Sequence, residues 1–409
     1  GDRLSVLAYD RQVQVDPDLG KTPLAFPPPQ ASDVWPTVGG AADHAGGHAA
    51  LGSDLKKVWS ADIGEGASLE RPLIPTPVVA GGMIFTMDSG TGVRAFSPDK
   101  GQELWRVDLA PEAERGEATG GGLAFDQGRL FVATGYGEVF ALNPADGTTL
   151  WRQSVASPVR SAPAPGPGVV LVVTIDNRLV ALSMETGAVQ WRHAGILETA
   201  GLLGAPSPAV HGDTVLVAYS SGELFAVRAA NGREQWADNL AALRREGGVL
   251  SIAAIRGQPV LAAGGVAAVA ISNSGRLVAI DTRSGQRVWD QRVSGSQMPW
   301  VAGGTVFVVT NQAQLMALNL SDGRIRWVSQ LDQWETPNKR EGMIAWYGPV
   351  LAGNRLWLTN SDGRLRGYDP ATGTEAADLR LKTATNRPPI AVGNTLYTLD
   401  DKATLTAWR

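Results

Sequence analysis

The amino-acid sequence predicts an all-β protein, an eight-bladed β-propeller built from four-stranded antiparallel blades. Three observations predict this fold class. A Gly precedes a Trp by four residues, and the pair recurs every roughly 40 to 50 residues. A short apolar strand with Ala or Gly at its third position precedes each Gly, and turn-forming residues join that strand to the Gly. Four short strands and their turns fill a period of this length.

The Gly and Trp positions set the number of units. The pairs are Gly101/Trp105, Gly147/Trp151, Gly187/Trp191, Gly232/Trp236, Gly285/Trp289 and Gly323/Trp327. Gly373 and Ala377 keep the same register with the Trp replaced, and Trp59 lies one period before Trp105. These positions define eight units.

The strand before each Gly also occurs eight times. The copies begin at Val93, Val139, Leu179, Leu224, Leu277, Leu315, Leu365 and Leu405. The third residue of every copy is Ala or Gly, which leaves room for a bulky neighbour. We therefore expect each repeated Trp to pack on this small residue of a neighbouring strand.

Tight turns join this strand to the next one. Typical connections are 97–101, 143–147 and 369–373, which combine Ser, Asn or Asp with Pro and a final Gly. Asn and Asp accept local backbone hydrogen bonds, Pro presets φ, and Gly adopts positive φ. Another pair of apolar runs around a Gly lies upstream of most copies, so each unit reads as two successive hairpins.

The two ends of the chain predict how the ring closes. The last unit stops at Arg409, after its third strand, and the Trp59 strand at residues 55–63 has no preceding partner. We expect residues 55–63 to supply the fourth strand of the last blade, which removes two exposed strand edges. Residues 1–54 do not repeat and contain three consecutive prolines at 27–29. We expect an extended N-terminal arm or tether over 1–54 and the propeller over 55–409.

Composition excludes several classes of protein. With 36 Lys+Arg against 40 Asp+Glu, the net charge of -4 does not favour a nucleic-acid binder. The absence of Cys excludes disulfides, Cys-ligated metals and Cys nucleophiles. No apolar run approaches the roughly 20 residues of a membrane-spanning helix. Because the chain starts with Gly1 rather than Met, we expect a processed chain, with membrane contact only through a possible lipid anchor lost with its export signal.

Motifs for catalysis and metal binding are missing from the sequence. It contains no Gly-x-Ser-x-Gly elbow and no Gly-x-Gly-x-x-Gly phosphate loop. His44 and His48 are four residues apart, but Ala45, Gly46 and Gly47 between them disfavour a helix that would align them. We interpret both as loop histidines, and we predict no catalytic residue, no metal site and no cofactor.

One insertion stands out from the repeat. Trp334 and Trp346 flank the polar stretch 335–342, which includes Lys339, Arg340 and Glu341. Long loops often carry function. Two interpretations remain open: exposed Trp and Arg side chains for a protein interface, or Trp side chains that pack against the blade.

The repeat Leu-x-Ala-Leu-(Asn/Asp)-x-x-(Thr/Asp)-Gly-x-x-x-Trp resembles that of the pyrroloquinoline-quinone-type eight-bladed propellers over residues 55–409. Two kinds of protein share it: the quinoprotein dehydrogenases and the BamB family of the outer-membrane β-barrel assembly machinery. The dehydrogenases are longer and typically carry a vicinal Cys pair, which this chain lacks. The stretch from Asp281 to Leu318, and the point in the last blade where the chain ends, resemble the BamB family.

The resemblance implies a non-enzymatic scaffold at the periplasmic face of the outer membrane. Such a protein binds BamA and assists the insertion of unfolded outer-membrane proteins. The family's BamA-binding loop corresponds to residues 199–208, which implies roles for Leu202, Leu203 and Gly204. A second family loop, one blade further, corresponds to 244–254 and implies Arg244 and Arg245 in place of two acidic residues. The similar string 159–163 lies one blade earlier and ranks second to 199–208.

Two alternatives remain open at the level of sequence. One is a quinone-dependent dehydrogenase, which shares the fold. The other is a propeller that binds a different envelope partner or a polysaccharide.

Overall fold

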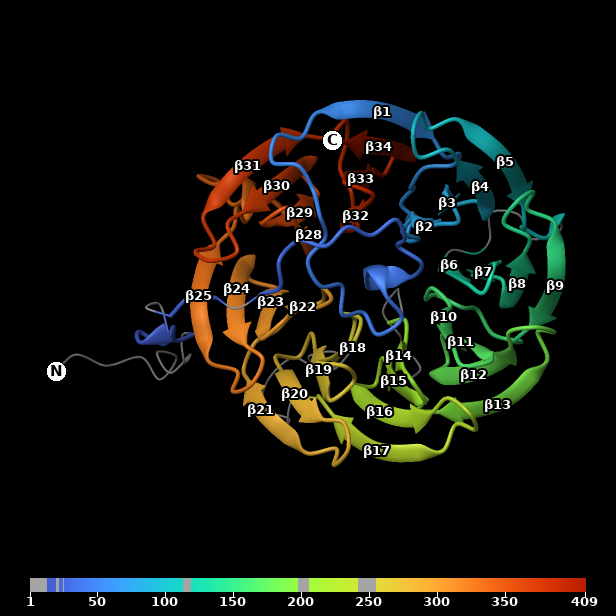
Figure 1. Cartoon of the computed structure of the whole chain (residues 1–409), viewed down its shortest axis with the longest axis horizontal. Coiled ribbons are helices and arrows are strands. Elements are labelled where there is room, and N and C mark those ends of the chain that lie inside the picture. The colour runs from blue at the N-terminus through green and yellow to red at the C-terminus, as the bar shows by residue number, and fades with distance from the viewer. Residues whose placement is uncertain are drawn as a thin grey trace.

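The computed structural model describes residues 13–19, 22–24, 26–112, 118, 120–197, 206–241 and 255–409. Eight four-stranded sheets are arranged as blades around a central axis (Figure 1). Neighbouring strands within each blade are antiparallel, as for β2, β3, β4 and β5. The predicted fold class is therefore confirmed.

Blades 1 to 4 follow one another directly along the chain. Blade 1 contains β2 (Val78–Ala80), β3 (Met83–Met87), β4 (Gly92–Phe96) and β5 (Glu103–Asp108). Blade 2 contains β6 (Gly121–Asp126), β7 (Arg129–Thr134), β8 (Glu138–Leu142) and β9 (Thr149–Ser154). Blade 3 contains β10 (Ala164–Gly166), β11 (Val169–Val173), β12 (Arg178–Ser183) and β13 (Val189–Ala194). Blade 4 contains β14 (Ala209–His211), β15 (Thr214–Ala218), β16 (Glu223–Arg228) and β17 (Glu234–Asn239).

Blades 5 to 8 complete the ring, with one additional hairpin. Blade 5 contains β18 (Val260–Ala262), β19 (Ala267–Ile271), β20 (Leu277–Asp281) and β21 (Arg287–Gln291). Blade 6 contains β22 (Trp300–Ala302), β23 (Thr305–Val309), β24 (Gln314–Asn319) and β25 (Ile325–Gln330), and the hairpin of β26 (Trp334–Thr336) and β27 (Glu341–Met343) follows it. Blade 7 contains β28 (Trp346–Ala352), β29 (Arg355–Asn360), β30 (Arg364–Tyr368) and β31 (Glu375–Arg380). Blade 8 contains β32 (Ile390–Val392), β33 (Thr395–Leu399), β34 (Thr404–Trp408) and β1 (Lys57–Asp62).

Blade 8 joins the two ends of the propeller. Strand β1 pairs antiparallel with β34, with Trp59 opposite Ala407 and Asp62 opposite Thr404. Backbone hydrogen bonds between Lys56 and Arg409 extend the pairing by one position. This pairing confirms the predicted closure of the ring, because the N-terminal strand covers the edge of the C-terminal strand that would otherwise be exposed.

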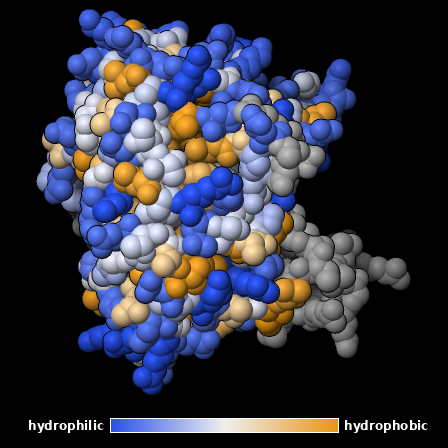
Figure 2. All heavy atoms as spheres, turned by 90° about the vertical axis from the view of Figure 1, so that its right-hand side faces the viewer, coloured by the Kyte–Doolittle hydropathy of each residue, from blue (hydrophilic) through white to orange (hydrophobic). Residues whose placement is uncertain are grey.

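The repeated Trp packs as the sequence predicts. In seven of the eight blades the Trp on the outermost strand lies opposite the Ala of the neighbouring strand, for example Trp151 opposite Ala141 and Trp327 opposite Ala317. The outer rim is otherwise mixed in character, with hydrophilic side chains around small apolar groups (Figure 2). The exposed large apolar side chains of the outermost strands are aliphatic, such as Leu104 and Leu150, whereas Trp151 and Trp327 are buried.

Each indole also contacts the next blade, which the sequence did not reveal. A Cβ added to Gly147 would lie 2.7 Å from the ring of Trp105, and one added to Gly187 would lie 2.6 Å from Trp151. These glycines also have positive φ, 75° and 74° respectively, so two independent constraints require Gly there. The indole nitrogens of seven Trp donate hydrogen bonds of 2.7–3.0 Å to carbonyl oxygens of the next blade, at Pro98, Pro144, Met184, Ala229, Thr282, Leu320 and Pro370.

The missing eighth Trp has a topological explanation. Ala377 on β31 faces blade 8, where the connection between the third and fourth strands is the break between Arg409 and Lys56. Blade 8 therefore has no Gly-containing turn to receive an indole. The absence of a receiving turn accounts for the small residue at position 377.

The described part of residues 13–54 crosses one face of the ring and reaches its centre (Figure 1). It contains a 3₁₀ turn, η3 (Val38–Gly40). Its backbone forms hydrogen bonds with the innermost strands of five blades, at Val79, Phe125, Val210, Leu261 and Leu351. It forms another with Gly393 in the first turn of blade 8. A further segment lies on the outer edge of blade 6, where the N–H of Asp16 donates to the carbonyl of Ile325. The segment satisfies backbone groups that would otherwise face an open channel.

Removal of residues 404–409 tests the closure of the ring. The deletion leaves β1 without its partner strand and β33 paired only with β32, and it removes Trp408, which is buried. We expect unfolding to require at least about 3–5 kcal/mol less free energy, the cost typical of losing a large buried aromatic residue. Chemical denaturation measures it, with Lys402→Ala on an exposed turn as the control. An unchanged midpoint would rule out the closure.

Trp151→Ala tests the contact between blades 2 and 3. The indole is buried, packs on Gly187 and donates to the carbonyl of Met184. We expect a loss of about 3–5 kcal/mol in unfolding free energy for the alanine variant. Trp151→Phe keeps apolar volume and should lose less. Leu150→Ala on the adjacent exposed position is the matched control, and equal losses at 150 and 151 would contradict the docking role.

Candidate functional site

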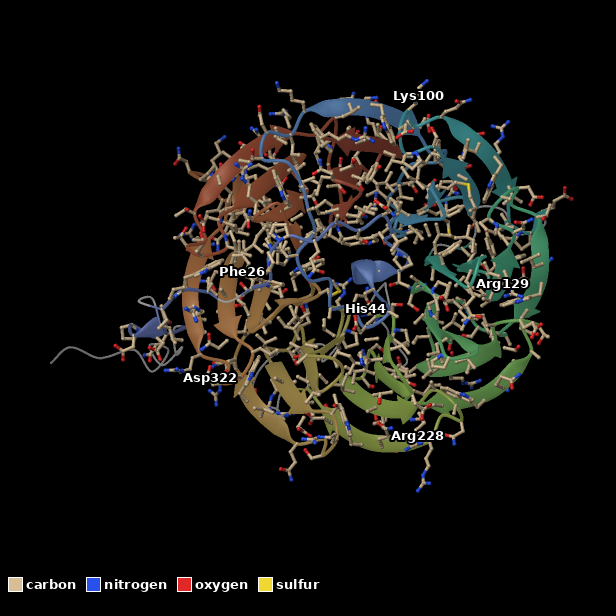
Figure 3. All side chains as sticks on the ribbon, in the orientation of Figure 1. Phe26, His44, Lys100, Arg129, Arg228 and Asp322 are labelled. Carbon is tan, nitrogen blue, oxygen red and sulfur yellow. The ribbon has the colours of Figure 1, made fainter. Side chains whose placement is uncertain are left out.

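The two faces of the ring differ in what covers them. Because the strands are antiparallel, all connections from the outermost strand of one blade to the innermost strand of the next emerge on one face, here called the loop face. The N-terminal segment bonds to the opposite ends of the inner strands and closes the other face, here called the arm face. His44 of this segment lies at the ring centre, whereas Lys100 lies at the outer edge (Figure 3).

A cavity of about 600 Å³ occupies the central channel. Trp35, Val38 and Gly39 of the N-terminal segment form part of its lining, which we take as the floor. Interblade connections supply most of the remaining wall, including Arg160, Arg256 and Arg387. The cavity, here called the funnel, therefore lies between the N-terminal segment and the described connections between blades.

The floor of the funnel is fixed by close aromatic packing. The rings of Trp35 and Trp300 stack with centroids 6.1 Å apart and planes 16° apart. The indole nitrogen of Trp300 donates to the carbonyl of Gly47 at 2.8 Å. A Cβ at Gly46 would lie 2.1 Å from the Trp300 ring, so only Gly fits at this approach. The floor is thus a packed structure rather than a loose flap.

His44 and His48 are structural, as we predicted for loop histidines. Nδ1 of His44 donates to the carbonyl of Pro259, and Nδ1 of His48 donates to that of Pro27, both at 2.7 Å. Burial lowers the pKa of His44 to about 4, so the ring is neutral at pH 7. Within the residues that the structure describes, no group of three or more His, Asp or Glu is placed to hold a metal ion.

Arg387 connects three segments at the funnel wall. Its guanidinium donates to the carbonyls of Leu399 and Asp400 at 3.0 and 3.3 Å, and also to that of Leu73. Its ion pair with Asp401 measures 3.2 Å. Burial lowers the pKa of Arg387 to about 10 although the Asp401 carboxylate opposes the shift. This network ties the connection before blade 1 to the hairpin of blade 8.

The described lining of the funnel is positively charged. It contains three Arg and no Asp or Glu, although the whole chain has net charge -4. Arg160 has no ion pair or hydrogen bond to a described residue, and burial alone lowers its pKa. The funnel wall therefore holds one cationic group, Arg160, without a carboxylate partner in the described part of the chain.

The loop face carries the most exposed large apolar side chains of the described residues. Leu69 is 105% exposed, Met343 72%, Leu197 64% and Ile196 60%, whereas no other one exceeds 55%. All four belong to connections between blades. Exposed apolar groups gathered on one face are typical of surfaces that bind a partner.

The partner-binding residues predicted from sequence lie outside the described residues, so their prediction stays open. Leu202, Leu203 and Gly204 belong to the connection between β13 and β14, and Arg244 and Arg245 to that between β17 and β18. Ile196 and Leu197, which are described, lead directly into the first connection.

In the insertion after blade 6, the packing interpretation holds for Trp346, and the interface interpretation stays a prediction. Trp346 is buried, and its indole nitrogen donates to the carbonyl of Asp332 at 2.8 Å, which is a packing role. Trp334 is half-buried, and residues 335–343 of the β26–β27 hairpin are exposed. The hairpin thus extends the loop face, and Met343 and Ile344 reach the funnel lining.

Sequence reasoning missed the funnel. Trp35 and the three Arg come from segments that do not repeat, and no spacing connects them. The one signal was the string 159–163, which we ranked second as a binding loop and which contains Arg160.

The fold and these repeats define an eight-bladed propeller of the pyrroloquinoline-quinone type, and comparison with known proteins narrows the class. The family model described as "Outer membrane protein assembly factor BamB" matches residues 89–329. The chain belongs to this family.

Individual relatives agree with the family. A BamB of Yersinia pestis is 27% identical over 317 residues, covering 75% of this chain and 79% of the relative. An uncharacterised protein of Rickettsia conorii is 26% identical over 269 residues, covering 65% of this chain but only 64% of the relative. The match thus spans less than two thirds of that relative's length.

Solved structures show the same fold. BamB from Moraxella catarrhalis superposes with a TM-score of 0.73 at 19% identity, covering 87% of this chain and all of that chain. Quinohemoprotein alcohol dehydrogenase from Comamonas testosteroni gives a TM-score of 0.70 at 16% identity, covering 97% and 82%. At these identities the likeness concerns the fold alone. Among the described residues, no helix has the length and apolar character that a bilayer crossing requires.

The buried neutral His44 predicts a pH dependence of stability. Its folded pKa of about 4 lies below the ordinary histidine value of 6.5, so the unfolded chain takes up the proton first as pH falls. Stability contributed by His44 is full above pH 6.5 and declines toward pH 4, by up to about 3 kcal/mol. Thermal unfolding at pH 7.5 and 5.0 measures the decline.

His44→Asn is the non-titrating control for this prediction. Asn tolerates the positive φ of 60° at this position, and its amide offers a donor for the carbonyl of Pro259. Burial also lowers the pKa of His48, so the double variant with His48→Asn isolates both contributions. The same loss of stability at pH 5.0 in wild type and the double variant would show that other groups cause it.

Proposed function

We propose that this chain is a non-catalytic scaffold of the outer-membrane β-barrel assembly complex that binds the periplasmic part of BamA through its loop face. The observation that carries the proposal is the exposed pair Ile196 and Leu197, at 60% and 64%, leading into the connection that corresponds to the family's BamA-binding loop. Membership of the BamB family supports the same role. In this proposal residues 1–54 are the arm, residues 55–409 the propeller, and the periplasmic face of the outer membrane the location.

The physical reasons favour the loop face over the arm face. Backbone hydrogen bonds of the N-terminal segment already occupy the inner strand ends on the arm face. The loop face combines uncovered apolar side chains with long connections, which commonly carry binding residues. Leu202, Leu203, Gly204, Arg244 and Arg245 belong to these connections and are proposed partner contacts. Unfolded outer-membrane proteins are further proposed ligands of the complex.

Paired substitutions test the proposal. We expect Ile196→Asp with Leu197→Asp to leave stability within about 0.5 kcal/mol, because both side chains are exposed. Affinity for the purified periplasmic part of BamA should fall roughly tenfold or more, about 1.4 kcal/mol. Leu202→Asp with Leu203→Asp should have the same effect. Calorimetry or surface plasmon resonance gives the dissociation constants.

A matched pair on the outer rim controls for added charge. Leu104 and Leu150 are 49% and 51% exposed on β5 and β9, and the same double change to Asp there should leave BamA binding unchanged. If both loop-face pairs bind BamA as tightly as wild type, the assignment of the loop face is wrong. Pull-down from an envelope extract then identifies whether another envelope protein takes this role.

A quinone-dependent dehydrogenase is the second candidate, favoured by the fold likeness to the Comamonas testosteroni enzyme. The residues of the funnel do not fit it well. The described lining offers no carboxylate, whereas Ca²⁺, which those enzymes use, prefers carboxylate and carbonyl oxygens. Incubation with pyrroloquinoline quinone and Ca²⁺, followed by dye reduction with an alcohol, decides the question.

A further inference from the structure

The boundary between blades 3 and 4 departs from the repeat at a position that anchors the other connections. Four residues after each repeated Trp, or after Ala377 in its place, seven units carry an aliphatic residue, and six of these seven are buried. Leu109, Leu240 and Leu331 are examples. Blade 3 has Gly195 at this position. The connection that follows β13 therefore leaves its blade without an apolar anchor.

Tyr219 of blade 4 occupies the space that the missing side chain leaves. The residue that begins the turn between the second and third strands is a short, buried polar residue in the other seven blades, such as Thr174 and Ser272. In blade 4 this residue is Tyr219, which is fully buried. A Cβ added to Gly195 would lie 2.4 Å from the Tyr219 ring. The Gly and the Tyr are therefore a paired exchange across the two blades.

The Tyr219 ring is fixed by its neighbours. Nδ1 of His193 lies 2.8 Å from the Tyr219 hydroxyl, and the two rings are nearly parallel with centroids 5.9 Å apart. Nε2 of His193 lies 2.9 Å from a carboxylate oxygen of Glu234. Phe225 contacts the ring edge-on at 5.8 Å between centroids. Tyr219 is therefore a rigid support under the start of the connection.

Both backbone polar groups of Ile196 are held by side chains, one from each blade. Its N–H donates to Oε2 of Glu223 at 2.6 Å, and its carbonyl accepts from Nδ2 of Asn177 at 2.8 Å. Asn177 is itself buried, and its Oδ1 accepts from the N–H and the hydroxyl of Ser220 at 3.2 and 3.0 Å. These hydrogen bonds fix the direction in which the chain leaves β13.

Asn177 is another departure from the repeat. The equivalent turn position is Gly, Ala or Thr in the other seven blades, as at Gly137, Ala313 and Thr91, and none of these side chains carries an amide. The backbone there has φ of 56°, which Asn tolerates. Only the boundary between blades 3 and 4 thus combines an amide, a Gly and a Tyr at these three positions.

The side chains at this point face solvent although the backbone is held. Ile196 and Leu197 are 60% and 64% exposed. Apolar groups that are already ordered lose less conformational entropy when a partner covers them, which favours binding. Exposure of the pair together with a fixed backbone is therefore the arrangement of a preorganised contact.

We propose that Asn177, Tyr219 and Glu223 are positioning residues that hold Ile196 and Leu197 outward for contact with the partner. The partner's identity as BamA rests on the proposed function. The three positioning residues act through the apolar pair and do not contact the partner themselves. They distinguish this connection from the other seven, in which the repeat is anchored by an aliphatic side chain.

Asn177→Gly with Glu223→Ala tests the positioning role on the full chain. Gly keeps the turn, because it stands at the same position in blade 2, and the double change removes both hydrogen bonds to Ile196. We expect affinity for the purified periplasmic part of BamA to fall about fivefold or more, because the pair must then be ordered on binding. Calorimetry gives the dissociation constants, and thermal unfolding confirms that the variant is folded.

A combination of variants separates positioning from a general structural effect. When Ile196→Asp and Leu197→Asp are already present, the change at 177 and 223 should weaken BamA binding no further, because both act through the same pair. The matched control is Ala313→Gly with Glu138→Ala, which makes similar changes at the equivalent positions of blades 6 and 2 and should leave affinity unchanged. If the double variant lowers the melting temperature, Glu223→Ala alone at its partly exposed position replaces it.

The exchange between Gly195 and Tyr219 is tested without BamA. Gly195→Leu alone should lower the melting temperature because its side chain meets the Tyr219 ring, and Tyr219→Thr alone should lower it because a cavity remains. In the double variant the Leu fills that cavity, as in the other blades, so the loss should be smaller than the sum of the two single losses. Additive losses would contradict the exchange.

The outcomes distinguish this inference from the proposed function. If Ile196→Asp with Leu197→Asp weakens BamA binding but Asn177→Gly with Glu223→Ala does not, the positioning role is wrong and the proposed function stands. Additive losses of affinity on the two pairs would also overturn the positioning role. If the Asp pair leaves BamA binding unchanged, the pair is not the contact, and the partner assignment fails even when the exchange between positions 195 and 219 is found.

Discussion

The docking of an indole on the next blade is the contact on which the ring depends. Each Trp lies against the Gly of the following blade's turn and donates to a carbonyl of that blade. The Gly and Trp of one unit are four residues apart but take part in two different contacts between blades. The Gly receives the indole of the preceding blade, and the Trp reaches the following one. This chain of seven contacts explains why the two residues repeat together and why the series stops at Ala377, where blade 8 offers no turn.

The sequence predicted those parts of the structure whose residues recur in every repeat. Eight copies of the same strand specify the blades, and the orphan Trp59 strand together with the end at Arg409 specifies the closure. Local spacing also placed Trp opposite Ala correctly, because that pairing lies within one hairpin. Contacts with the next blade were missed because no local pattern states which residues meet across two blades.

The site was less predictable for the same reason. Trp35 meets Trp300, and Arg160 and Arg387 line the same cavity from opposite parts of the chain. None of these residues repeats, so periodicity carries no information about them. A family resemblance predicted two connections as binding loops, and the residues concerned lie outside the described part of the chain. The exposed Ile196 and Leu197 emerged only from the three-dimensional arrangement.

The arm face and the loop face of the ring differ in which residues they present. On the arm face, backbone bonds to five blades and the buried His44 make a floor that ties the inner strands together. On the loop face, cationic and apolar groups remain uncovered. A floor built from the chain's own N-terminal segment therefore covers the arm face, whereas the most exposed large apolar side chains of the described residues lie on the loop face.

The pairing of β1 with β34 has a consequence for how the protein is made. These strands come from opposite ends of the propeller sequence, so their contact has the largest sequence separation in the ring. Contacts of this kind form slowly, because a long loop must close before any stabilisation is gained. During synthesis or export, seven blades with local hairpins are able to assemble while blade 8 still lacks its edge. The last residues to emerge therefore decide when the nascent ring stops presenting free strand edges, and chains interrupted before residue 404 remain open to aggregation.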